Sequence, residues 1–241
     1  MENEVAVGMN RTGLDMAPRM KDELIQYAEG QAGLAPESDG AFAAVHMAYI
    51  EEAERVGSVP VPATMKGVAS TAASKTTGKN PEVLIDKLGE RLAFERTGTR
   101  LYEAMLMKCG VADAADNPVD AAQLAEIRDD EERHFHLLHG QIEKLGADPT
   151  AMTPCADVAG VQSLGIMQVI SDPRTTLAQA LNALLSAELT DNASWELLIE
   201  LAQQTGHDDM ANEFTTALKD EQRHLDMVRG WLREAVLKEA A

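Results

Sequence analysis

One short motif occurs twice in this chain and constrains the fold more than any other feature. Residues 130–134 read Asp-Glu-Glu-Arg-His, and residues 220–224 read Asp-Glu-Gln-Arg-His. In both copies a Glu precedes a His by three positions, so the two side chains share one face of a helix and can bind the same ion. The duplication therefore predicts helical surroundings and two metal ions.

Each copy follows a segment in which a single Glu interrupts an apolar stripe with helical spacing. The stripes are Leu84, Leu88, Leu92, Glu95 and Tyr102 in the first segment, and Leu177, Leu181, Leu184, Glu188 and Trp195 in the second. Such spacing is typical of a buried helix face. The chain thus contains a two-helix repeat, and we expect four helices to bring the two lone Glu residues and both Glu-x-x-His pairs to one level.

Capping residues mark the ends of these four helices. The expected caps are Asn80 with Pro81 and Gly110, Asp120 and Gly146, Asp172 with Pro173 and Gly206, and Asp208 or Asp209 for the start of the fourth helix. Residues 147–171 contain several Pro and Gly and are predicted to be a long connection between the ends of the bundle. We therefore predict an all-α four-helix bundle over residues 81–241, with a long crossover between its second and third helices.

The first 80 residues are less regular and are predicted to form an N-terminal extension packed on the bundle. Residues 21–29 and 41–56 have helical composition, whereas residues 70–79 read as a loop or a weak helix. An interaction arm is the alternative, and the composition of this segment is compatible with both.

The overall composition narrows the class of protein. Aromatic residues make up only 4% of the chain while Ala, Leu and Met are abundant, which is typical of packed helices. With 21 Lys and Arg against 40 Asp and Glu, the formal charge of −19 disfavours nucleic acid and anionic membranes as partners. We find no signal-peptide or membrane-spanning run and expect a cytoplasmic protein. Cys109 and Cys155 form no C-x-x-C pair, which argues against a disulfide framework and a cysteine-ligated iron site.

Burial of four Glu side chains in such a bundle requires compensation, because an unpaired buried carboxylate is costly. Two divalent ions would balance the four carboxylates while both His stay neutral. For a single Glu-x-x-His match, an exposed helix face is the better explanation. The duplication, with a Glu on an apolar stripe before each copy, favours the metal site instead.

This pattern resembles the ferritin-like dimetal-carboxylate superfamily across residues 81–235. The resemblance implies that Glu131 and Glu221 bridge two metal ions. The terminal ligands would be Glu95 and His134 for one ion, and Glu188 and His224 for the other. The Glu95 and Tyr102 pair is similar to rubrerythrins, and the D-E-x-R-H form resembles acyl-carrier-protein desaturases and bacterial multicomponent monooxygenases.

The Asp and Arg of each motif are expected to support the histidine of the other motif. A metal-binding His normally donates its second ring N–H to a carboxylate, which fixes the orientation of the ring. The predicted pairs are Asp220 with His134 and Asp130 with His224, held by Arg133 and Arg223 through charge-assisted hydrogen bonds. Surface ion pairs within one helix are the alternative.

Several neighbouring residues allow two interpretations each. Asp191 is either an extra ligand or a polar neighbour of Glu188. Gly98 either opens a small oxygen or substrate pocket or allows close helix packing. Tyr102 and Trp195 are core residues or have a redox or hydrogen-bonding role, and His136 and His139 are interpreted as ordinary surface or packing residues.

The resemblance implies a diiron oxidoreductase that activates O2 or peroxide to oxidise a small substrate. Iron is the expected metal, with manganese or a mixed iron–manganese pair as the alternative. A separate electron donor would be needed, and a homodimer is the expected assembly. The main alternative is a ferroxidase or iron-storage or iron-detoxifying protein, for which a closed cage is expected. A metal-free bundle that serves only as an interaction module is the third hypothesis.

Overall fold

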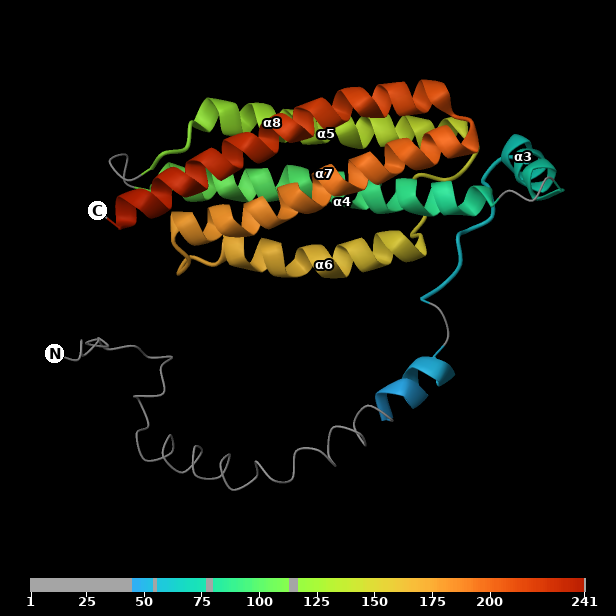
Figure 1. The fold of residues 1–241 in the computed structure, drawn as a ribbon, viewed down its shortest axis with the longest axis horizontal. Helices are drawn as coiled ribbons and strands as arrows, with labels where there is room; N and C mark the ends of the chain where they lie inside the picture. Colours follow the sequence, from blue (N-terminus) through green and yellow to red (C-terminus); the bar gives the residue numbers. More distant parts are fainter. Residues whose placement is uncertain (1–44, 54–55, 77–79, 113–116, 241) are drawn as a thin grey trace. The chain divides into compact units, whose positions relative to one another are not determined.

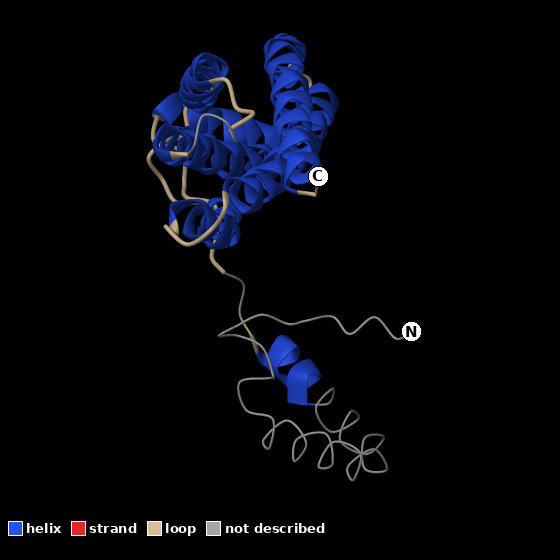
Figure 2. Ribbon diagram, turned by 90° about the vertical axis from the view of Figure 1, so that its left-hand side faces the viewer, coloured by secondary structure: helices blue, strands red, loops and turns tan. Residues whose placement is uncertain are grey.

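The computed structural model describes residues 45–53, 56–76, 80–112 and 117–240, which are mainly helical (Figure 1). The labelled helices are α3 Met65–Thr76, α4 Pro81–Val111, α5 Ala121–Lys144, α6 Pro154–Ser171, α7 Leu177–Thr205 and α8 Asp208–Glu239. Residues 45–52 form a further helical segment. Figure 2 shows helices and loops only, and none of the described residues lies in a strand. The all-α prediction is confirmed.

The chain divides into two compact units, residues 1–55 and residues 56–241, and the second contains α3 to α8. Residues 1–44, including the segment at 21–29, lie outside the described residues. The expected domain boundary near residue 80 falls between α3 and α4, inside the second unit. Part of the stretch expected to be a loop or weak helix belongs to α3. The backbone N–H of Thr64, just before α3, donates to the carbonyl of Gly146 after α5 at 3.2 Å.

Two helical hairpins, α4–α5 and α7–α8, form the four-helix bundle (Figure 1). The hairpins are joined face to face, because α4 contacts α7 and α5 contacts α8. In the chain, α6 connects the two hairpins. It packs against α4 and α7 and carries the chain back along the bundle (Figure 1). As a result α7 runs antiparallel to α4 and in the same direction as α5, which is the consequence expected of a long crossover.

The predicted long crossover over residues 147–171 is confirmed, and the structure shows in addition that it contains a regular helix, α6. Its two prolines and two glycines do not prevent this. Pro154 occupies the first turn of α6, where proline is favourable because the first N–H groups of a helix have no partner within it. Gly160 and Gly165 have open space around them. Although α6 is largely apolar, no helix among the described residues is long and apolar enough to cross a bilayer.

The third bundle helix begins later than predicted. Asp172, expected as its N-cap, is instead the C-cap of α6, and its carboxylate binds Arg174 at 2.9 Å. α7 begins at Leu177, where Thr176 and Gln179 form a capping box. Asp172 with Pro173 and Thr176 with Gln179 are both suitable local signals for a helix start. The first is not used as one because α6 has its C-cap at Asp172.

A polar layer divides the interior of the bundle into two apolar cores. The first core includes Leu101, Met105, Leu124, Ile127, Leu181, Leu184 and Val228, and the second includes Leu84, Leu88, Leu92, Leu138, Trp195, Leu198 and Phe214. Each of the four bundle helices contributes to both cores. The close packing of the cores therefore holds the residues between them at a defined depth inside the bundle.

Candidate metal centre

The six predicted metal ligands lie in this polar layer, and all are buried. Glu95 projects from α4, Glu131 and His134 from α5, Glu188 from α7, and Glu221 and His224 from α8. None of them exposes more than 4% of its surface. The alternative of an exposed helix face is therefore excluded for these residues.

Glu221 lies at the centre of the layer, with one carboxylate oxygen near each histidine. Its Oε1 is 2.6 Å from Nδ1 of His134, and its Oε2 is 3.3 Å from Nδ1 of His224. Nδ1 of His224 is also 3.5 Å from Oε1 of Glu131, and Nδ1 of His134 is 3.8 Å from Oε2 of Glu95. Each histidine thus faces the shared Glu221 and one further carboxylate.

Three overlapping groups of potential ligand atoms each fit within 4.8 Å. They are Glu95, His134 and Glu221; Glu131, Glu221 and His224; and Glu95, Glu131, Asp191 and Glu221. Among the described residues, Glu188 belongs to none of these groups, although it is buried in the same layer. The structure therefore brings five of the six predicted ligands together and adds Asp191.

The unpaired atoms of this layer fit bound cations. The buried side-chain atoms without a hydrogen-bond partner include Glu95 Oε2, Glu131 Oε1, Glu188 Oε2, Glu221 Oε1 and both ring nitrogens of His134. The short contact between His134 and Glu221 lacks hydrogen-bond alignment, so it does not satisfy either atom. Unpaired buried polar atoms are rare because each one loses its hydrogen bonds to water. Carboxylate oxygens and imidazole nitrogens in one place are the donors that iron and manganese prefer.

Both histidines present Nδ1 to the carboxylates, and their Nε2 atoms face the Asp residues of the other motif. Nε2 of His224 is 3.0 Å from Oδ2 of Asp130, the partner assigned to it from the sequence. Nε2 of His134 is 3.6 Å from Oδ2 of Asp220, beyond a direct hydrogen bond. In this geometry Nδ1 of each ring is the atom that would face a bound ion, and the Asp near Nε2 would orient the ring.

Asp130 binds both of the supporting arginines. Arg133 from its own helix and Arg223 from α8 both form ion pairs with its carboxylate. Burial alone would raise the pKa of Asp130, but His224 and Arg133 outweigh it and lower the pKa to about 2. The contacts of Asp220 are longer, at 3.7 Å to Arg133 and 3.9 Å to Arg223. The two supporting arrangements are therefore unequal.

The protonation of the layer shows the cost of burying its charges. Burial raises the pKa of Glu95, Glu131 and Asp191 well above the usual carboxyl range, and neighbouring carboxylates raise it further. Burial and the nearby Glu221 raise the pKa of Glu188 to about 8. Burial alone would raise the pKa of Glu221, but the two histidines beside its carboxylate outweigh burial and lower the pKa to about 2. Without metal, bound protons therefore neutralise buried carboxylates of the layer. A cation that binds there has to displace these protons, so metal binding must release them.

Arg91 is the one member of the layer that sequence reasoning missed. Its guanidinium is buried, lies 3.1 Å from Glu95 through Nε and 3.0 Å from Asp191 through Nη1, and stacks over the ring of Phe94. An arginine in an amphipathic helix normally indicates the solvent face, so the residue type by itself gives no sign of a buried position. Its position four residues before Glu95 was the available signal, because it places both side chains on one face.

The aromatic residues of the repeat are both fully buried beside the layer. The hydroxyl of Tyr102 donates to Oε1 of Glu188 at 2.5 Å, so this residue has a hydrogen-bonding role. Trp195 packs edge-on against the ring of His134, with centroids 5.6 Å apart. His136 and His139 point away from the layer and are partly or fully exposed.

Gly98 is where the carboxylate of Glu131 enters the layer. A Cβ added to Gly98 would lie 2.9 Å from Cδ of Glu131 and closer still to Oε2. The missing side chain therefore makes room for a predicted ligand, which corresponds to the interpretation of close packing rather than an open pocket.

Gly98→Ala is accordingly expected to displace the Glu131 carboxylate and to lower the amount of bound metal per chain well below that of the wild type. Metal analysis after reconstitution with Fe(II) and desalting measures this. Gly110→Ala, on the same helix with nothing near its Cβ position, is the matched control and should bind metal normally. Normal metal content in Gly98→Ala would mean that Glu131 is not a ligand.

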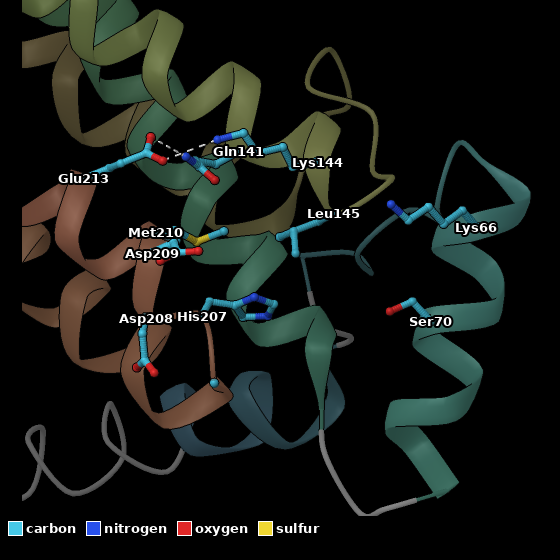
Figure 3. A pocket seen from close by; sticks show the side chains of 11 residues that line it. Lys66, Ser70, Gln141, Lys144, Leu145, His207, Asp208, Asp209, Met210 and Glu213 are labelled. Carbon is cyan, nitrogen blue, oxygen red and sulfur yellow. Dashed lines mark hydrogen bonds and ion pairs between the residues drawn. The ribbon is translucent and has the colours of Figure 1, made fainter.

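One groove among the described residues lies away from this layer. It has a volume of about 610 Å³ and is lined by residues of α3, the end of α5 and the turn between α7 and α8 (Figure 3). Glu213 contacts Gln141 at 2.7 Å and Lys144 at 3.4 Å on its wall. None of the six predicted ligands lines the groove, so we assign the chemistry to the buried layer.

Comparison with known proteins agrees with this assignment. The family model for the ferritin-like domain matches residues 85–237, a range that contains all six predicted ligands. No curated protein and no solved structure gives a significant match.

Proposed function

The chain belongs to the ferritin-like domain family, and on that premise we propose that it is a dimetal oxidoreductase that activates O2 or peroxide. Iron is the proposed metal, with manganese or an iron–manganese pair as the alternative. The observation that carries the proposal is the buried layer, in which carboxylate and imidazole atoms without hydrogen-bond partners face one another. A bundle that served only as an interaction module would have no reason to bury them.

The proposed coordination has two positions. Glu95 and His134 would hold the ion at the α4–α5 position, and Glu188 and His224 would hold the ion at the α7–α8 position. Glu221 would bridge the two positions, because one of its oxygens lies near each histidine. Glu131 would be the second bridge, since its Oε1 lies 3.5 Å from Nδ1 of His224 and its other oxygen fills the space at Gly98.

The protein's contribution is to hold these groups dry and in fixed orientation. Bound iron would supply the electrons and the open coordination sites at which O2 or peroxide reacts. The two apolar cores exclude water on both sides of the layer. Asp130 fixes the ring of His224, and Tyr102 holds the side chain of Glu188 in place. Burial raises the pKa of Tyr102 well above its usual value, so its hydroxyl remains a donor.

A ferroxidase or iron-storage role is the second candidate, favoured by the acidic surface that the charge of −19 implies. The two functions differ in assembly and in the fate of the metal. Size-exclusion chromatography distinguishes a homodimer, proposed for the enzyme, from a closed cage that stores iron. For the enzyme we also propose a cytoplasmic location and a separate reductase as electron donor, because the chain has no C-x-x-C pair.

The proposal is tested by anaerobic reconstitution with Fe(II), metal analysis, and exposure to O2 or peroxide under absorption spectroscopy. We expect about two iron ions per chain and a new near-ultraviolet absorption on oxidation. Glu131→Ala should reduce both. Binding of less than one equivalent, with no effect of Glu131→Ala, would contradict the dimetal assignment.

A further inference from the structure

Arg91 is a permanent cation inside the proposed metal centre. Among the described residues it is the one buried basic side chain other than histidine, and it exposes only 2% of its surface. Its contacts are to Glu95 on its own helix and to Asp191 on α7. Nη2 has no hydrogen-bond partner, so the guanidinium is held chiefly by these two carboxylates and by the Phe94 ring.

The two halves of the internal repeat differ at the residues around this cation. Counting from the lone Glu of each half, Arg91 corresponds to Leu184 and Gly98 corresponds to Asp191. The cation and its second partner therefore have no counterpart at the equivalent places of the other half. Arg91 contacts a ligand of the α4–α5 position, whereas the α7–α8 position has the neutral hydroxyl of Tyr102 against Glu188.

The net charge of the layer is the same whether or not this pair is counted. Its five carboxylates are Glu95, Glu131, Glu188, Asp191 and Glu221, and Arg91 opposes them with one positive charge. Fully ionised, the layer thus has the charge that two divalent ions neutralise while both histidines remain neutral. Arg91 and Asp191 cancel each other, so they leave the total unchanged but distribute it unevenly between the two positions.

We propose that Arg91 is a built-in counter-ion that makes the two metal positions unequal, so that the α7–α8 position binds its ion more tightly and fills first. This inference rests on the proposed dimetal function and assigns Arg91 and Asp191 as positioning residues. A divalent ion at the α4–α5 position has to bind beside a guanidinium, and in a buried site this repulsion is only weakly screened. The α7–α8 position lacks such a neighbour.

The test is an anaerobic titration of the metal-free protein with Mn(II), in which electron paramagnetic resonance measures the free ion. The wild type is expected to bind two ions in a tight and a weak phase. His224→Ala should remove the tight phase and His134→Ala the weak one, which assigns each phase to its position. This measurement needs no substrate and no turnover.

Two substitutions at the ion pair should then move the weak phase in opposite directions. Arg91→Met is expected to strengthen it about tenfold, because the repulsion is lost, and Asp191→Asn should weaken it by about the same factor. In the metal-free Arg91→Met variant a proton can take the place of the lost positive charge, and the incoming ion has to displace it. Because the ion carries two charges and the proton one, the gain in affinity persists. The double variant should return to within about threefold of the wild type, since the two residues act as a pair.

Arg100→Met, which removes an exposed arginine from the same helix, is the matched control and should leave both phases unchanged. A merely structural role for Arg91 would weaken metal binding in every variant of the pair, and that result would overturn the inference. Unchanged phases in both single variants would also overturn it. Should Arg91→Met fail to fold, Arg91→Gln is the second variant, and its weak phase is expected to strengthen for the same reason. Failure of the wild type to bind two ions would instead contradict the proposed function itself.

Discussion

Glu221→Ala is expected to remove both bound metal ions, whereas replacement of either histidine should remove only one. The reason is geometric, because Glu221 directs Oε1 to His134 at 2.6 Å and Oε2 to His224 at 3.3 Å. A carboxylate between two positions is shared by both ions, while each imidazole serves one. Metal analysis of the reconstituted and desalted variants gives the number of ions per chain directly.

Asp226→Ala is a suitable control for this experiment, since Asp226 lies on the same helix and is exposed. It should bind metal as the wild type does. Retention of one tightly bound ion by Glu221→Ala would show that Glu221 serves a single position, and the proposed bridge would then be wrong.

Removal of a buried carboxylate should make the metal-free protein more stable and make the stabilisation by metal disappear. Glu131→Gln is the clearest case, because burial and the nearby Glu221 and Glu95 raise the pKa of Glu131 well above its usual value. Without metal, this group opposes folding at neutral pH, since its ionised form is favoured in the unfolded chain. A neutral amide of the same shape lacks that cost, so the thermal midpoint of the metal-free variant should rise by a few degrees.

Bound metal reverses the order of the two proteins. A ligand present at 100 times its Kd stabilises the folded state by about 2.7 kcal/mol for each site. For a chain of this size about 1 kcal/mol shifts the midpoint by about 2–4 °C, so two sites should raise the wild-type midpoint by about 10 °C or more. Glu131→Gln should show little of this increase. Calorimetry with Mn(II) and with a chelator provides the comparison.

Glu132→Gln is the matched control, because it changes the neighbouring exposed Glu and should behave as the wild type. If the metal-free Glu131→Gln protein were less stable than the wild type, Glu131 would be contributing favourable contacts without any ion. In that case the carboxylate layer would be structural, and the argument from its unpaired atoms would fail.

The features that depend on helical periodicity could be predicted from the sequence. A Glu and a His three residues apart share a helix face in any fold, and the apolar residues on either side of Glu95 and Glu188 identify the buried side of each helix. The bundle helices and their order follow from the same periodicity and from caps such as Asp120, whose carboxylate accepts from the backbone N–H of Ala122. The burial of all six predicted ligands is the consequence of these local rules.

Other features depend on which helices become neighbours, and these could not be predicted. The apolar residues of 154–171 become α6 because α4 and α7 provide a surface for them. Gly98 leaves room for Glu131 only because α5 approaches α4 at that residue.

What the sequence alone determined is the set of chemical groups and the helix face on which each one lies, because helix geometry is local. What only the tertiary structure decided is how those groups are paired. Arg91 enters the layer because Asp191, a hundred residues away in the chain, meets it across the α4–α7 contact. Electrostatic pairing depends on distance in space and on the exclusion of water, and neither quantity exists until the helices have packed.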